Sequence, residues 1–257
     1  MQNAQGVYRA SRFTSLFRPP GSIFLLSALI ALAPVPWVVA NWVPQGDEQH
    51  YLLAAHSLVF DGDLDLANNY AQGDFRQFYD APIDRHVRIG VDGRSYLSHD
   101  IGLPILIAPA YALGGRAGVT IFLAIVAALV AVNVYLLALE VAGDRTAAVI
   151  TWLVLSLTPL LSVYAYLVYP EMIGALLVIW SVRQILPHPL PPLLTTIPRS
   201  SGEGNALLPL SRSIRSLRER GMGGEVAVAI SLLPWLSARF VLIAAFLVVW
   251  TVPLLRR

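Results

Sequence analysis

Two acids and a histidine occur together in the sequence Gly46-Asp47-Glu48-Gln49-His50-Tyr51. Carboxylates beside an imidazole can accept a proton as a general base or can bind a cation. Asp47 and Glu48 could also cap a helix, whose positive N-terminal end they would stabilise. The apolar residues of 51–60 recur at helical spacing, which predicts a short amphipathic helix on the membrane surface that ends at Asp61. The capping and catalytic interpretations both stay open.

Two further charged residues stand beside or within long apolar runs. Glu171 separates two such runs, which favours a functional carboxylate at a membrane edge. Alternatively, Pro170 and Glu171 simply begin a helix. Arg239 is the single charged side chain within 226–255, where it could bind a phosphate through two hydrogen bonds, mark a bend or extend to the headgroups.

Metal-binding patterns in the same polar region have no strict spacing. His99, followed by Asp100, could join His50 and Asp47 in a metal site. The acidic run 61–65 lacks the glycine and glutamate that an EF-hand calcium loop has at its sixth and twelfth positions, so we interpret it as a solvated turn.

The composition indicates a membrane protein. The chain has 257 residues, of which 56% are hydrophobic and 13% charged, whereas soluble domains have roughly 25% charged residues. Because cysteine is absent, disulfide scaffolds, thiol enzymes and cysteine-ligated metal sites are excluded. All 18 basic residues are arginine, and no arginine-rich stretch adjoins an aromatic surface, so we expect no nucleic-acid partner.

Charge-free runs predict about four membrane spans in an all-α polytopic protein. A helix needs about 20 apolar residues to cross the bilayer. The first span is expected at 21–43, and a three-span bundle at 117–187 comprises runs 117–139, 146–170 and 172–187. In the last run we expect Arg183 to extend to the headgroups. The first run could also be a cleaved signal peptide, but its length and Pro34 favour an anchor.

Arginine distribution predicts the orientation in a cytoplasmic (inner) membrane. Residues 1–20 and the loop 188–223 are rich in arginine and should be cytoplasmic. Residues 44–100 hold ten acids and four arginines, so the large loop 44–116 is expected outside, carrying short interfacial helices. Residues 101–115 are too short for a span and are expected as a re-entrant or interfacial helix. Residues 224–257 are expected to form a broken helix pair with Arg239 at the turn, or else one tilted, kinked helix.

Several short motifs together resemble a known family. They are GDEQHYL (46–52), DGDLDLANNY (61–70), SHDIGLP (98–104), APAY (108–111), YPE (169–171) and LPW (233–235). They are similar to the N-terminal half of bacterial membrane glycosyltransferases of the C-type (GT-C) fold, relatives of protein mannosyltransferases and aminoarabinose transferases. The resemblance spans roughly residues 20–255.

The resemblance implies inverting transfer of a sugar from a polyprenyl-phosphate donor to an acceptor hydroxyl at the outer face of the membrane. It implies acidic residues at Asp47, with Glu48 beside it, and at Glu171, and a phosphate-binding residue at Arg239. His50, Tyr51 and His99 are expected to line the substrate site. No cofactor is required, although some members bind a divalent ion, for which Asp47, His50 and His99 are the candidates.

Such enzymes usually continue with further spans, so we expect that this chain is a fragment or that a partner membrane chain supplies the missing spans. Besides the lipid-linked donor, membrane lipids are the expected partners. The alternative to an enzyme is a non-catalytic integral membrane subunit whose acidic outer loop binds a partner. A transporter fits less well, because the central runs hold almost no charge.

Overall fold

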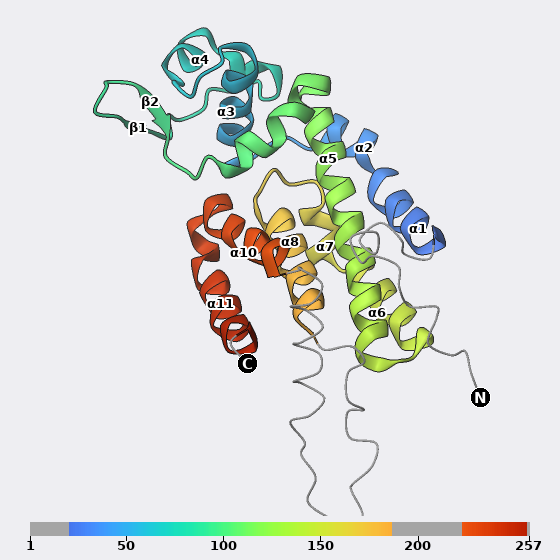
Figure 1. Ribbon diagram of the computed structural model, residues 1–257. Coiled ribbons are helices and arrows are strands. Elements are labelled where there is room, and N and C mark those ends of the chain that lie inside the picture. Colours follow the sequence, from blue (N-terminus) through green and yellow to red (C-terminus); the bar gives the residue numbers. More distant parts are fainter. Residues whose placement is uncertain (1–20, 187–222, 256–257) are drawn as a thin grey trace, which may run out of the picture.

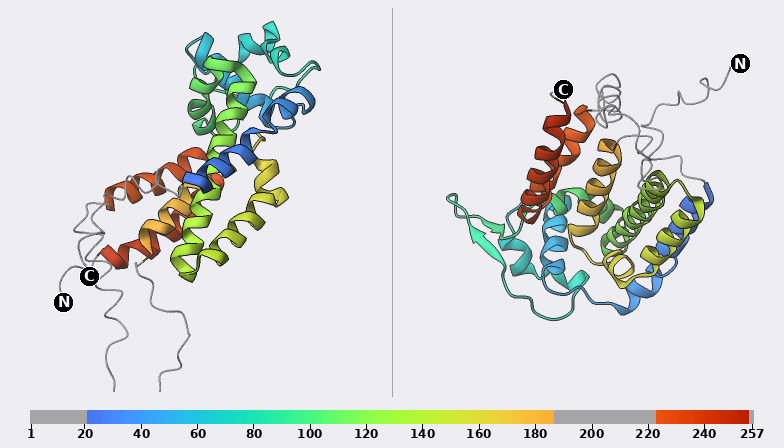
Figure 2. Two further views of the ribbon diagram at one scale, coloured as in Figure 1. Left: turned by 90° about the vertical axis from the view of Figure 1, so that its right-hand side faces the viewer. Right: turned by 90° about the horizontal axis from the view of Figure 1, so that it is seen from below.

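The computed structural model describes residues 21–186 and 223–255. It is mostly helical, and its helices form a bundle with a cap of short elements at one end (Figure 1). The cap consists of the segment between α2 and α5, and Figure 2 shows the bundle helices from two further directions. The long helix α5, Gly102–Ala142, contacts both parts and is the central element of the fold.

The first predicted span is a helix interrupted by prolines. Helix α1 covers Gly21–Leu32 and α2 covers Val35–Asn41, with Pro34 between them and Pro36 in the first turn of α2. Together they form an apolar stretch of 21 residues, which is long enough to cross a membrane. Within the described ranges, the other helix of sufficient length and apolar composition is α5. These two helices suggest membrane association on length and composition alone.

Helix α5 contains a sharp bend at Gly114 and Gly115. Gly115 has a φ of +53°, in the left-handed region that favours glycine. The bend falls at the boundary between the two segments that the sequence predicts, 101–115 and 117–139. The two halves approach closely, since a Cβ on Gly118 would lie 2.1 Å from the carbonyl oxygen of Ala110. A proline-containing short helix is thereby packed against a long one.

The other two predicted spans are not long enough. The run 146–170 breaks into α6 (Arg145–Leu157) and α7 (Pro159–Tyr164), because Pro159 lacks the N–H that would continue the helix. The run 172–187 forms α8, Glu171–Ile185, of only 15 residues. The prediction of four full spans is therefore not confirmed.

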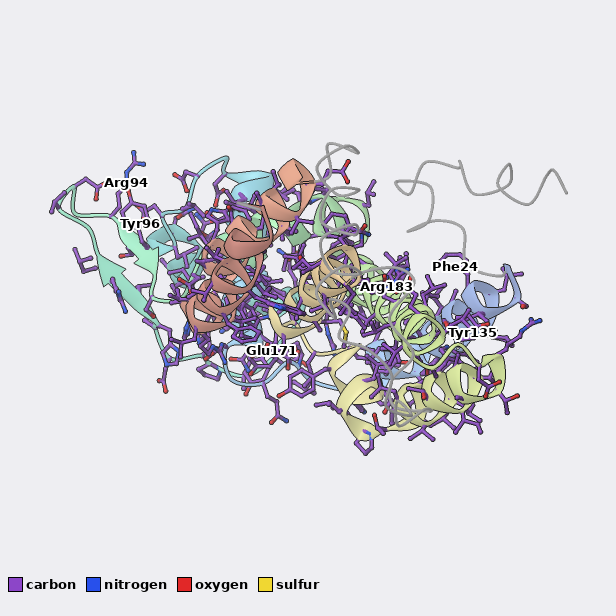
Figure 3. All side chains as sticks on the ribbon, turned by 60° about the horizontal axis from the view of Figure 1, so that its bottom comes forward. Phe24, Arg94, Tyr96, Tyr135, Glu171 and Arg183 are labelled. Carbon is purple, nitrogen blue, oxygen red and sulfur yellow. The ribbon has the colours of Figure 1, made fainter. Side chains whose placement is uncertain are left out.

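The prediction that Arg183 extends to the headgroups is wrong. It is 5% exposed and donates two hydrogen bonds to Glu140, from Nε at 3.0 Å and Nη2 at 2.6 Å, and one to Asn133 at 2.6 Å. Figure 3 shows Arg183 on α8 in the interior of the bundle. A buried charge needs such partners, so this cluster joins α8 to α5.

The C-terminal segment is a pair of helices. Helix α10 covers Gly223–Leu236, the short η3 covers Ala238–Phe240 and contains Arg239, and α11 covers Val241–Leu255. The two helices contact each other and α10 also contacts α8. A single kinked helix, the alternative from the sequence, is thus not formed.

The segment 44–101 differs from the prediction in two respects. It contains helices α3 (Glu48–Phe60), α4 (Ala67–Gln72) and η2 (Asp74–Gln77). It also contains an antiparallel hairpin of β1 (Val87–Ile89) and β2 (Ser95–Leu97), so the fold is not entirely α-helical. Helix α3 ends at Asp61 as predicted, but it is not a surface helix, because residues 48–57 are all buried and the helix packs against α5.

Candidate functional site

The N-terminus of α3 directs the Asp47 side chain outward. Gly46 has a φ of +56° and Asp47 is the N-cap residue, yet its carboxylate makes no capping hydrogen bond. Asp47 Oδ1 instead lies 3.3 Å from Nε2 of His99, 52 positions further along the chain. The capping interpretation therefore does not account for the Asp47 carboxylate, which stays partly exposed beside a histidine.

Glu48 has a different position and a structural explanation. It is 5% exposed, and its two carboxylate oxygens accept hydrogen bonds from the backbone N–H groups of Gln45, at 2.9 Å, and Val168, at 2.7 Å. Burial raises the pKa of Glu48, while the two backbone hydrogen bonds oppose that shift. With both oxygens engaged, Glu48 connects the start of α3 to the α7–α8 connection and is not available to a substrate.

Glu171 and Arg239 form an ion pair. Arg239 Nη1 donates to Glu171 Oε1 at 3.0 Å, and the arginine side chain is 60% exposed. Glu171 Oε2 is buried and has no hydrogen-bond partner within residues 21–186 and 223–255, and the Glu171 side chain does not cap α8. Figure 3 labels Glu171, the first residue of α8. The start of α8 and the α10–α11 turn thus meet through these two residues.

The Tyr51 hydroxyl is influenced by both acidic positions. It is buried, and burial, followed by the nearby carboxylate of Asp47, raises the pKa of its phenol to about 12. Glu171 acts in the same direction and Arg239 in the opposite one, which places all three charges within electrostatic range of a single hydroxyl group. The tyrosine remains protonated at neutral pH and can donate a hydrogen bond.

The sequence-predicted residues Asp47, Tyr51, His99, Glu171 and Arg239 are therefore neighbours in the fold. The ring centroids of Tyr51 and His99 are 5.6 Å apart. A further contact holds the group together, since Asp100 Oδ2 accepts a hydrogen bond from the backbone N–H of Ala238 at 3.0 Å. Four separate segments of the chain, around residues 47, 99, 171 and 239, thus form one polar region at the junction of cap and bundle.

His50 is not part of the metal geometry that the sequence suggested. It is 3% exposed, and its Nδ1 lies 2.9 Å from the Tyr70 hydroxyl. Burial, then the proximity of His86 and His99, lowers its pKa to about 4, so the ring is neutral at physiological pH. Among the described residues, the group able to hold a metal is Asp47, His86 and His99, whose ligand atoms lie within 4.8 Å of one another.

His86 was missed by the sequence analysis. It immediately precedes β1, and its carbonyl oxygen accepts hydrogen bonds from Ser98 N, at 3.0 Å, and Ser98 Oγ, at 2.8 Å. The turn sequence Val91-Asp92-Gly93 between two short alternating runs was the available signal, because Asp-Gly favours a tight hairpin turn. A hairpin there would have placed the residues before and after it, His86 and His99, close together.

The acidic run 61–65 is structural, in agreement with the solvated-turn interpretation. Asp63 Oδ1 accepts from Asp65 N at 3.0 Å, and Asp65 Oδ1 accepts from Ser95 N at 3.0 Å. Asp61 Oδ2 accepts from the side-chain amides of Asn68 and Asn69. These carboxylates fix the turn and the hairpin.

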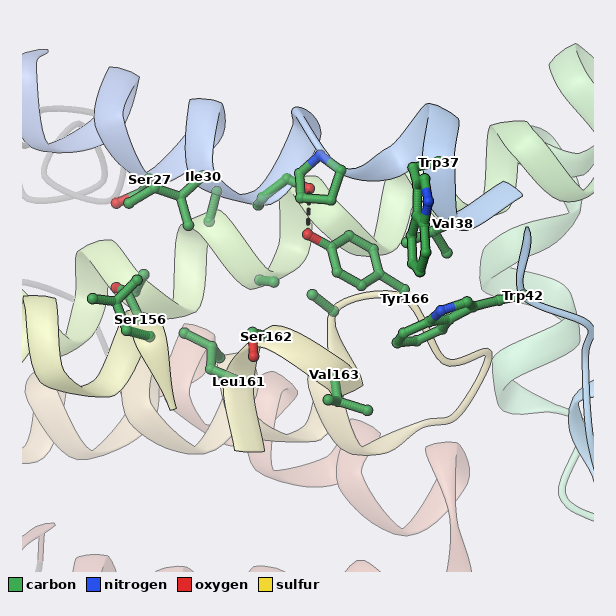
Figure 4. Close-up of a pocket in the computed structure, with 17 residues that line it drawn as sticks. Ser27, Ile30, Trp37, Val38, Trp42, Ser156, Leu161, Ser162, Val163 and Tyr166 are labelled. Carbon is green, nitrogen blue, oxygen red and sulfur yellow. Dashed lines mark hydrogen bonds between the residues drawn. The ribbon is translucent and has the colours of Figure 1, made fainter. Parts of the chain in front are cut away.

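A separate apolar cavity of about 420 Å³ lies where two helices are interrupted (Figure 4). Its walls come from the α1–α2 break, from α5 and from the α6–α7 break, and include Trp37, Trp42 and Tyr166. Tyr166 donates a hydrogen bond to the carbonyl oxygen of Ala31 at 3.0 Å. Of the described residues that line the cavity, Tyr166 is the only ionisable one, so the cavity suits hydrocarbon rather than a charged group.

In comparisons with known proteins, the chain matches no family model, no curated protein and no solved structure.

Proposed function

We propose that the chain is a membrane glycosyltransferase, or part of one, that transfers a sugar from a polyprenyl-phosphate donor to an acceptor hydroxyl at the outer face of the membrane. The observation that carries the proposal is the convergence of Asp47, Tyr51, Glu171 and Arg239 from distant parts of the chain. Their spacing along the sequence does not by itself require these residues to be close together in the fold. The motif resemblance and two helices of membrane-spanning length support the same function.

The chemistry needs a base and a group that stabilises the departing phosphate. In a single inverting displacement, the acceptor oxygen bonds to the anomeric carbon while the bond from that carbon to the phosphate oxygen breaks. The acceptor proton passes to a carboxylate, for which partly exposed Asp47 is the proposed base. The electron pair of the broken bond leaves with the polyprenyl phosphate, and Arg239 is the proposed partner of that developing charge.

The apolar cavity agrees with a lipid-linked substrate. It lies between the two helices of membrane-spanning length, and its 420 Å³ fall within the range of roughly 300–1,000 Å³ for ligand sites. A chain that acts on a lipid carrier needs an apolar surface for the carrier's hydrocarbon, and this cavity offers one.

Sugar transfer in proteoliposomes tests the proposal. With a polyprenyl-phosphate-linked sugar as donor, Asp47→Asn should reduce kcat by about 10²–10⁴-fold, because the amide cannot accept the acceptor proton. Arg239→Gln should lower transfer as well, since the phosphate loses its cationic partner. Asp92→Asn, which changes an exposed carboxylate at the hairpin turn, serves as the matched control and should leave turnover unchanged.

Equal turnover by Asp47→Asn and the wild type would remove Asp47 from the mechanism. A folded wild-type chain that binds no polyprenyl-phosphate donor would contradict the proposed function and favour the non-catalytic subunit.

A further inference from the structure

The base of the hairpin and the N-terminus of α3 bring three metal-ligand side chains together. His86 precedes β1, His99 follows β2, and Asp47 stands before α3. One ligand atom from each lies within 4.8 Å of the others. We propose that Asp47, His86 and His99 form a zinc site that joins the hairpin to the start of α3. The site shares Asp47 with the proposed sugar transfer, but zinc binding can be measured without that reaction.

The contact between Asp47 and His99 has the geometry of shared coordination. Zinc lies about 2.0–2.1 Å from nitrogen ligands and about 2.0–2.2 Å from oxygen ligands, so two ligands of a tetrahedral site are about 3.3 Å apart. Asp47 Oδ1 and His99 Nε2 are 3.3 Å apart. Among the described residues, His99 Nε2 nevertheless has no hydrogen-bond partner, and it is inaccessible to solvent. A buried nitrogen that faces a carboxylate oxygen without hydrogen bonding to it is well placed to share a cation with that oxygen.

Backbone hydrogen bonds hold His86 in position, and its imidazole packs on the ring of His50, with the ring centroids 4.3 Å apart. The His86 N–H donates to the Tyr70 hydroxyl at 3.4 Å, and its carbonyl oxygen accepts both hydrogen bonds from Ser98. The His86 residue is exposed to solvent, so the proposed site is open to an incoming ion on this side. A site built on a fixed backbone loses little conformational entropy when the metal binds.

The donor set selects the metal. Two imidazole nitrogens and one carboxylate favour zinc over magnesium and calcium, which prefer oxygen ligands. Three protein ligands leave the fourth tetrahedral position to water or to another ligand. The surrounding segment 44–100 has ten acids against four arginines, which raises the local concentration of cations.

Zinc binding by the full chain tests the inference without any activity measurement. The protein is purified in detergent with a tag free of histidine, depleted with a chelator and titrated with ZnCl₂, and bound zinc is measured by mass spectrometry and calorimetry. The wild type should bind one zinc per chain at this site, with an increase in Tm. His86→Gln should weaken the affinity at least about 10–100-fold, the loss already seen when only an outer-shell partner is removed.

Asp92→Asn, on the same hairpin but outside the proposed ligand group, is the control and should bind zinc as the wild type does. His86→Gln alters an exposed side chain that the proposed sugar transfer does not use, so its folding is expected to be intact. Undiminished zinc affinity in His86→Gln would overturn the site, as would a wild type that binds no zinc or prefers Mg²⁺ or Ca²⁺. Loss of zinc binding with sugar transfer retained would separate the metal site from the proposed function.

Discussion

Adjacent acids at the start of α3 have different environments. The Asp47 carboxylate is partly exposed and faces His99, whereas the Glu48 carboxylate is buried and accepts two backbone hydrogen bonds. The direction in which each side chain leaves the helix N-terminus produces this difference, although the residues are neighbours in the sequence. Asp47 is thus suited to contact a substrate or cation, and Glu48 to hold two loops together.

Replacement of Glu48 by glutamine should lower the stability of the fold. The amide has one acceptor oxygen, so one of the N–H groups of Gln45 and Val168 would face an NH₂ group and lose its partner. An unsatisfied buried donor costs roughly 1–3 kcal/mol, and removal of the buried charge, whose burial raises the pKa of Glu48, offsets part of that cost. Thermal unfolding in detergent should show a lower Tm for Glu48→Gln. Asp80→Asn, at an exposed position, should leave the Tm unchanged. Equal Tm values for both variants would contradict the role of Glu48.

The charged residues of the polar region were predictable from the sequence, whereas residues whose role depends on a distant partner were not. Asp47, Glu171 and Arg239 were recognisable because each charge adjoins an apolar run, where charge is costly. His86 and the Arg183–Glu140 pair were missed, because their significance depends on partners distant in the sequence. Arg183 and Glu140 are 43 positions apart, and periodicity contains no information about which helices pack together.

At the scale of elements, helix existence was predictable and helix length was not. The break at Gly114–Gly115, the end of α3 and the separation of α10 from α11 all carry glycine, proline or charge signals that the sequence displays. Pro159 is also visible in the sequence, but the prediction of one continuous span over 146–170 does not take into account that proline removes a helical hydrogen bond. The burial of α3 could not be inferred, because it results from packing against α5.

Close packing of α5 against α10 should make Gly102 intolerant of a side chain. A Cβ at Gly102 would lie 2.4 Å from the carbonyl oxygen of Trp235 and 2.8 Å from Cα of Leu236, both backbone atoms that cannot easily move. Gly102→Ala should therefore destabilise the protein by about 1–3 kcal/mol. The measurement is the Tm in detergent, with Gly21→Ala as the control, since a Cβ there meets no atom within 4 Å. A stability equal to that of the wild type would show that α10 does not pack on α5 in this way.

For the whole molecule, the polar region and the Arg183 cluster lie at opposite ends of α8, with Glu171 in its first turn and Arg183 in its last. The part of α5 after its bend runs from Gly115 to Ala142 and is about 40 Å long at 1.5 Å per residue, more than the roughly 30 Å of a bilayer core. A membrane around this part of α5 would place the hairpin on one side and the α5–α6 connection on the other.

Because the sequence contains no cysteine, single substitutions can report this sidedness without background. Arg94→Cys, at the exposed hairpin turn, should react in intact cells with a maleimide that cannot cross the membrane. Arg145→Cys, at the exposed start of α6, should react only after the membrane is permeabilised. The reverse pattern would place the polar region in the cytoplasm and contradict the proposed outer-face chemistry.

The ion pair between Glu171 and Arg239 has a consequence for how the protein is made. Synthesis proceeds from the N-terminus, so Asp47, His99 and Glu171 leave the ribosome well before the η3 turn that carries Arg239. Until then, Glu171 has no arginine opposite it and Asp100 lacks the N–H of Ala238. A nascent chain therefore cannot complete the polar region before residue 239 has been synthesised, and an mRNA truncated before codon 239 would yield a protein without the arginine that pairs with Glu171.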